Sequence, residues 1–192
     1  MHIPLTSDQA LDLAQRYSEL PSYEAGVSNG QADEQIERRF QTIRGRGHMV
    51  PEDLRHIAKW KYPGKALVNL VEKNTQIEVT EISRASFSAT TERLRVGALL
   101  ALHGVGWPMA SVILHFAFPD RYPMLDKRVM RVVGVPHAYS FARWVEYTDL
   151  CREASRRLEV SLRVLDRALW TLDRTSTPDG TTARRHGLSV DP

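Results

Sequence analysis

A glycine turn and a later carboxylate are the residues whose types and spacing could do chemistry together. The turn is His103-Gly104-Val105-Gly106, and Asp126 follows it after an apolar run. Glycines allow backbone conformations that a Cβ would forbid. A helix that starts at such a turn offers unpaired amides at the positive end of its dipole, which attract a phosphate. The pattern therefore predicts an anion-binding turn followed by one acidic group.

The elements that must position these groups lie between Leu99 and Val133. The apolar spacing predicts a helix, the glycine turn, a second helix and a loop that contains Pro119 and Pro123. Asp126 then opens a third helix. Aspartate is also a favoured N-cap residue, so Asp126 has a purely structural interpretation that is compatible with a catalytic one.

This segment resembles the helix-hairpin-helix DNA glycosylase superfamily, which includes endonuclease III and the adenine-mismatch glycosylases. Tyr122-Pro123-Met124-Leu125-Asp126 with Arg128-Val129 looks most like the adenine-mismatch branch. His103 replaces the usual proline of the signature, and Pro108 stands where the bifunctional members carry a nucleophilic lysine. The positions that match the signature are Leu102, Gly104, Val105, Gly106, Ala110, Ile113 and Asp126.

The resemblance implies an enzyme that cuts the bond between a base and its sugar. The sugar ring becomes positively charged in that reaction, and a fixed carboxylate, here Asp126, stabilises the charge and orients a water. The hairpin would hold a phosphate while the target nucleotide turns out of the stack. Pro108 cannot form a Schiff base. The resemblance therefore implies a monofunctional N-glycosylase that acts on a modified or mismatched base and does not nick the strand.

The same resemblance supplies an expected DNA surface and an expected ion site. The expected partner is double-stranded DNA. A monovalent cation would be held by the backbone carbonyls of Leu100, Leu102 and Val105, and no iron–sulfur cluster is expected because Cys151 is the single cysteine. The residues expected to contact DNA are His103, Gly104, Val105, Gly106, Trp107, Met109, Ser111, Lys61 and Arg128.

A second basic stretch lies outside the signature, at Lys59-Trp60-Lys61-Tyr62-Pro63-Gly64-Lys65. Aromatic rings stack on unpaired bases, and lysines neutralise phosphates. The alternative is that Trp60 belongs to the core and that the lysines are solvated. Lys61 could also enter the cleft from the other lobe.

Composition sets broad limits on the protein class. The chain has 192 residues, of which 42% are hydrophobic and 26% charged, and its net charge is +3. The sequence pI of about 9.2 suits a polyanionic partner without requiring one. No apolar run reaches the length of a membrane span, and no signal pattern opens the chain, so we expect a cytoplasmic monomer.

The chain as a whole predicts an all-α fold of nine or ten helices. Capping signals mark several helix starts, such as Thr6 with Gln9 and Thr75 with Glu78. We expect one glycosylase-like domain over residues 1–175, with two helical lobes and the helix-hairpin-helix at 88–118, and a disordered tail at 176–192. In the superfamily the N-terminal segment often returns to join the C-terminal helices.

Two other functions remain open at this point. The chain could be a catalytically inactive helix-hairpin-helix module that binds DNA structures or assists another factor. It could also be an interaction protein whose hairpin is only structural. Salt-dependent DNA affinity would separate the DNA-binding hypotheses from the last one, because phosphate contacts release counterions.

Overall fold

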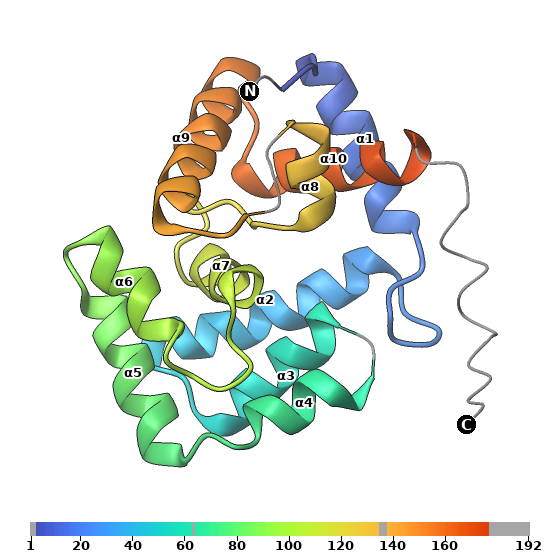
Figure 1. The fold of residues 1–192 in the computed structure, drawn as a ribbon. Coiled ribbons are helices and arrows are strands. Elements are labelled where there is room, and N and C mark those ends of the chain that lie inside the picture. Colours follow the sequence, from blue (N-terminus) through green and yellow to red (C-terminus); the bar gives the residue numbers. More distant parts are fainter. Residues whose placement is uncertain (1–2, 63, 135–137, 177–192) are drawn as a thin grey trace, which may run out of the picture.

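The computed structural model describes residues 3–62, 64–134 and 138–176, and within these ranges the regular elements are all helices (Figure 1). An all-α fold is therefore confirmed. The predicted tail lies outside the described residues except for Ser176, which ends the last helix. The helices are α1 (Ser7–Glu19), α2 (Asn29–Arg46), α3 (Pro51–Lys61), α4 (Lys65–Val71), α5 (Gln76–Ser88), α6 (Glu92–Leu99), α7 (Trp107–Ala117), α8 (Lys127–Val132), α9 (Phe141–Leu158) and α10 (Leu162–Ser176).

The helices form two lobes that share α7 between them (Figure 1). An internal lobe consists of α2 to α6. A terminal lobe consists of α1, α8, α9 and α10, and α1 packs along α10 although the two helices come from opposite ends of the described chain. The expected return of the N-terminal segment to the C-terminal helices is thus observed. One hydrophobic cluster runs through both lobes, with Phe40 and Leu54 at one end and Leu165 and Leu169 at the other.

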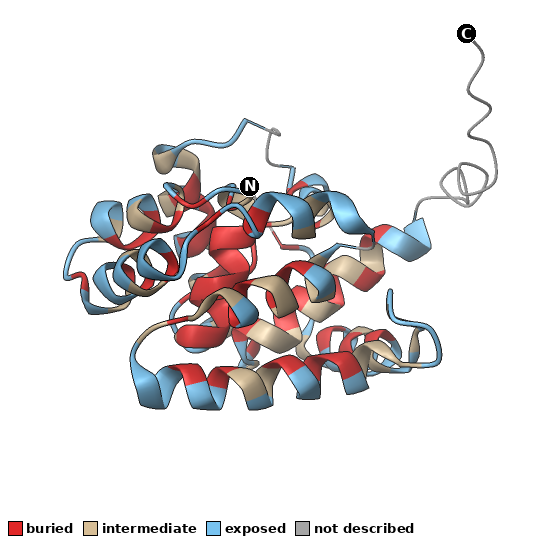
Figure 2. Ribbon diagram, turned by 90° about the horizontal axis from the view of Figure 1, so that it is seen from below, coloured by how far each residue is buried: buried red, intermediate tan, exposed pale blue. Residues whose placement is uncertain are grey.

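Helix α7 is the central element of this core. Every residue from Met109 to Ala117 is buried, and Figure 2 shows a helix that is buried along most of its length in the middle of the fold. The unbroken apolar run predicted a helix here, but it did not show which face of that helix would be buried. A helix that is covered on all faces needs no polar stripe.

Local capping chemistry explains where the other helices begin. Thr6 with Gln9 and Thr75 with Glu78 form the predicted capping boxes, and Ser140 caps α9. The apolar spacing predicts a helix over 88–102, but α5 extends to Ser88, and α6 begins after the Thr91 cap and ends at Leu99. The capping signal at Thr75 predicts a short helix, and the helix observed there, α5, is longer, with 13 residues.

The side chain that sequence reasoning misplaced most clearly is that of Leu94. The helical spacing of Leu94 with Ala98, Leu99 and Leu102 predicts that it faces the core, but it is 54% exposed on the outer face of α6. Cys151 is buried as predicted, and burial raises the pKa of its thiol to about 12. Among the described residues, no helix has both the length and the apolar character needed to cross a bilayer.

Candidate active site

Asp126 is the N-cap residue of α8, and its side chain is held at both oxygens. Oδ1 accepts a hydrogen bond from the Arg128 backbone N–H at 2.9 Å. Oδ2 accepts one from the Lys61 ammonium at 2.8 Å, across 65 positions of sequence. The structure therefore joins the acidic group of the terminal lobe to a lysine at the end of α3, in the internal lobe.

This ion pair is sheltered but open to solvent. The side chains of Lys61 and Asp126 are 15% and 21% exposed. Burial on its own would raise the pKa of Asp126, but the Lys61 charge and the two hydrogen bonds outweigh it and hold that pKa below its ordinary value. Burial likewise opposes the charged form of Lys61, yet Asp126 raises the lysine pKa. Both groups are therefore ionised at neutral pH.

A second carboxyl group, that of Asp166 on α10, lies within electrostatic reach of the pair. Burial raises its pKa to about 6, although the charges of Arg163 and Lys61 act in the opposite direction. Arg163 donates a hydrogen bond to its Oδ2 at 2.5 Å. The site thus holds two carboxyls whose pKa values are shifted apart, an arrangement typical of functional sites.

The hairpin between α6 and α7 is fixed by a residue that the sequence did not single out. Asn74 Oδ1 accepts from the His103 N–H at 2.8 Å, and Asn74 Nδ2 donates to the His103 carbonyl at 3.0 Å. Asn74 is buried, so this two-point clamp ties the turn to the end of α4. Neither its residue type nor its distance of 29 positions from His103 gave a sequence signal.

The two hairpin glycines have different roles. Gly104 adopts a positive φ of +77°, and a Cβ there would come within 2.7 Å of Val71 Cγ1. Gly106 is exposed, has ordinary extended backbone and meets nothing closer than 3.9 Å. It forms the N-cap of α7. Because glycine has no side chain, no side-chain oxygen accepts from the first amides of this helix.

The structure links the hairpin helix to the carboxylate through Ser111. Its hydroxyl accepts from the Leu125 N–H at 2.8 Å and donates to the Pro108 carbonyl at 2.7 Å. Because Leu125 directly precedes Asp126, Ser111 positions the segment that carries the acid. We expected Ser111 and Met109 to contact DNA, but both side chains are buried and we remove them from that surface.

The other residues expected at the DNA surface divide by exposure and partner. The His103 side chain and Gly106 are exposed, whereas the Val105 side chain is buried and only its backbone could take part. Trp107 is half-buried, with its ring centroid 6.3 Å from that of Trp144. Arg128 forms an ion pair with Asp173 at 3.2 Å, which engages it in the packing of α8 on α10.

The last groups near the site are a buried histidine and the expected cation ligands. His115 is fully buried against the Tyr122 carbonyl, at 2.7 Å from its Nδ1, and burial lowers its pKa to about 3. It is therefore neutral and structural. Among the expected cation ligands, the Leu102 carbonyl accepts from the Val105 N–H at 3.1 Å and keeps one lone pair. Within the described ranges, no three His, Cys, Asp or Glu side chains gather as a metal site.

Comparison with known proteins gives one structural similarity. No protein-family model matches the chain, and no curated protein matches it. The chain is similar to a solved structure titled as a Methanocaldococcus jannaschii 8-oxoguanine glycosylase/lyase in complex with 15mer DNA containing 8-oxoguanine. The two chains are 17% identical, the similarity covers 89% of this chain and 82% of that one, and the TM-score is 0.44.

Proposed function

We propose that this protein binds DNA and excises a modified or mismatched base as a monofunctional N-glycosylase. The observation that carries the proposal is the ionised Asp126, fixed at the start of α8 by Lys61 and the Arg128 N–H. Ser111 ties its loop to α7, whose first turn follows the exposed Gly106. The carboxylate and the N-terminus of α7, which no side chain caps, thus belong to a single connected unit.

The proposed reaction uses Asp126 as a fixed negative charge. As the C1′–N bond breaks, the base leaves with the bonding electrons and the sugar becomes cationic. Asp126 stabilises that cation and accepts a proton from the water that attacks C1′. A proton from solvent neutralises the departing base. The product is an abasic site on an unbroken strand.

Lys61 supports the hydrolytic form of this reaction. A Schiff base needs a neutral amine as nucleophile. The Asp126 charge raises the pKa of Lys61, so its amine is protonated at neutral pH. In this proposal Lys61 keeps the carboxylate ionised and in place. It does not attack the sugar.

The hairpin is proposed to bind the phosphate backbone beside the target nucleotide. Backbone contacts of this kind position a protein on DNA without reading sequence. A monovalent cation held by the carbonyls of Leu100, Leu102 and Val105 would add positive charge there. Replacing potassium by lithium should then weaken DNA affinity, and equal affinity in both salts would remove the cation from the proposal.

A catalytically inactive DNA-binding module is the second candidate, and the Lys61–Asp126 contact is the observation that favours it. A carboxylate already paired at 2.8 Å has less charge to offer a sugar cation. In that case the pair would be a purely structural link between the lobes. DNA affinity without base release, in wild type and variant alike, would support this function.

The test is a panel of duplexes, each with one damaged or mismatched base. Treatment with alkali then cuts the strand at any abasic site. Wild type should release one class of base, and Asp126→Asn should release none while binding the same duplex. Equal activity in both proteins would remove Asp126 from the mechanism. A covalent product trapped with borohydride would overturn the monofunctional assignment and point to Lys61 as the nucleophile.

A further inference from the structure

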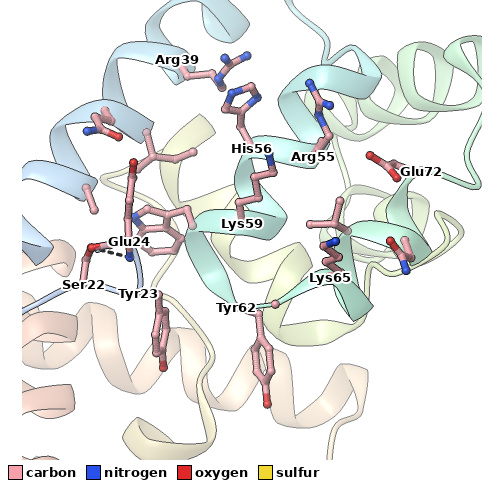
Figure 3. A pocket seen from close by; sticks show the side chains of 17 residues that line it. Ser22, Tyr23, Glu24, Arg39, Arg55, His56, Lys59, Tyr62, Lys65 and Glu72 are labelled. Atoms are coloured by element: carbon pink, nitrogen blue, oxygen red, sulfur yellow. Dashed lines mark hydrogen bonds between the residues drawn. The ribbon is translucent and has the colours of Figure 1, made fainter. Parts of the chain in front are cut away.

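A pocket of about 850 Å³ opens on the internal lobe, between α2, α3, α4 and the turn after α1 (Figure 3). Neither Lys61 nor Asp126 lines it, and no hairpin residue does. Arg55 and Lys59 are four residues apart and share the face of α3 that lines the pocket. Lys61 follows two residues later, roughly 200° further round the helix. The pocket therefore adjoins the candidate active site without containing Lys61 or Asp126, and Tyr23 on its wall lies within electrostatic reach of Lys61.

Positive charge without a partner lines this pocket. Arg55, Lys59 and Lys65 have no acidic side chain within 4.0 Å among the described residues. Arg39 also lines it, but Asp53 engages that guanidinium at 2.9 Å. The lining carboxylates are Glu24 and Glu72, so cations outnumber acids. Three cations that line one pocket without an acidic partner among the described residues favour an anionic ligand.

Aromatic rings are the second feature of the pocket. Tyr23 and Tyr62 are 49% and 58% exposed, which is unusual for large rings with no apolar cover. They point in the same direction in Figure 3. Trp60 lines the wall and packs edge-on against Phe116, with ring centroids 5.4 Å apart. Exposed rings beside unpaired cations match the needs of a base with its phosphate.

We propose that this pocket binds an unpaired nucleotide of a single-stranded DNA segment. The base stacks on Tyr23 or Tyr62, and the phosphates on either side pair with Arg55, Lys59 and Lys65. A duplex would not serve as well, because its bases are stacked on one another and present only their edges. The volume is within the range of pockets that hold small ligands. The inference refines the substrate of the proposed function to DNA that has an unpaired stretch beside the excised base.

The charge contribution is tested with the double variant Lys59→Gln/Lys65→Gln and a fluorescent oligothymidine strand. Anisotropy titrations at several salt concentrations give both affinity and its salt slope. Each phosphate contact adds about 0.7 to the slope for single strands, so losing two should reduce it by ~1.4 and lower affinity at 0.1 M salt by about 25-fold. Arg16→Gln/Arg156→Gln removes the same charge from α1 and α9 and should leave the slope nearly unchanged. Equal loss in both double variants would overturn the site.

The stacking contribution is tested at Tyr62. Tyr62→Ala should weaken oligothymidine binding by about tenfold, whereas Tyr62→Phe keeps the ring and should bind as wild type does. Free thymidine monophosphate is the competitor. If it displaces the strand at equal phosphate concentration, the pocket takes a free nucleotide and the strand assignment is overturned. If none of the pocket variants changes the affinity for the single strand, the strand assignment is also overturned.

These measurements are independent of base excision. Asp126→Asn should keep the Tyr62 dependence of single-strand binding, because Asp126 does not line the pocket. Loss of excision in Asp126→Asn with intact strand binding would therefore support both proposals, excision by Asp126 and strand binding in the pocket. Strand binding by a protein that excises nothing would support the pocket and refute only the enzyme.

Discussion

The Lys61–Asp126 pair offers the sharpest test of the structure, through the stability of single and double variants. Asp126→Asn removes the charge but keeps a good N-cap residue for α8. Lys61→Met removes the ammonium but keeps an unbranched apolar stem. Each single variant leaves its partner charged in a sheltered place. The double variant leaves no charge there.

The magnitude follows from the exposure of the pair. Removing one partner of a fully buried pair costs roughly 3–5 kcal/mol. Lys61 and Asp126 keep 15% and 21% exposure, so water compensates part of the loss. We expect each single variant to lower the free energy of unfolding by about 2 kcal/mol, and the double variant to lower it by the same amount, which gives a coupling of ~2 kcal/mol.

Urea denaturation at pH 7 measures these free energies, with the Asp12–Arg16 pair of α1 as the control. That pair is 57% and 61% exposed, so its own cycle should give a coupling of only about 0.3–0.5 kcal/mol. If the two single effects at Lys61 and Asp126 simply add, within ~0.5 kcal/mol, the two side chains do not interact and the reasoning about the site fails.

The pH dependence of the coupling has a definite sign. Asp126 has a lowered pKa in the folded state, so its contribution is present above the ordinary carboxyl value of 3.8 and is lost as pH falls through the folded value. Lys61 has a raised pKa, so its contribution is present below 10.5 and is lost as pH rises through the folded value. The coupling should therefore be constant between these limits and shrink outside them.

Three further predictions concern the hairpin and the second carboxyl. Gly104→Ala should destabilise the fold by about 1–3 kcal/mol, because of its positive φ and the Val71 contact, whereas Gly106→Ala should leave urea stability unchanged and weaken DNA affinity only. Asn74→Ala should cost about 1–3 kcal/mol and weaken binding of duplex DNA in anisotropy titrations, because the part-buried His103 amide loses its acceptor. The raised pKa of Asp166, about 6, means that the folded state binds more protons than the unfolded one between that value and 3.8, so its contribution to stability falls as pH rises through this window. Asp166→Asn should remove that component of the thermal melting profile, and an unchanged profile would contradict the assignment.

Local rules predicted the helices well, because each helix start is written in a few adjacent residues. The capping boxes at Thr6 and Thr75 appear as expected, and Asp126 caps α8. The prediction that Leu94 faces the core was wrong because periodicity shows that a helix has a buried face but not which neighbour covers it. The predicted start of α6 was wrong because the apolar pattern continues before Thr91, whereas the helix begins only after Thr91 caps it.

The site was only partly predictable, because its partners are distant in sequence. Asp126 could be found from its place after the hairpin, but the contact of Lys61 with it depends on how α3 packs against the segment before α8. The sequence allowed Lys61 to enter the cleft and gave no means of choosing its partner. The Asn74 clamp and the Ser111 tether are of the same kind. A single polar residue belongs to no repeating sequence pattern, so only the fold shows which distant group it hydrogen-bonds.

The pair also determines what DNA binding must accomplish if the protein is an enzyme. Lys61 occupies Oδ2 in the free protein, and we expect substrate binding to lengthen that contact as the sugar cation takes over part of the Asp126 charge. The lobes stay joined when this happens, because Asp33 on α2 pairs independently with Arg163 and Arg167 on α10. The structure thus holds two ionic links between the lobes: a buried cluster around Asp33, and the more exposed Lys61–Asp126 pair. In an inactive module the pair would remain a structural link whether or not DNA is bound, so its coupling energy and its response to DNA together decide between the two functions.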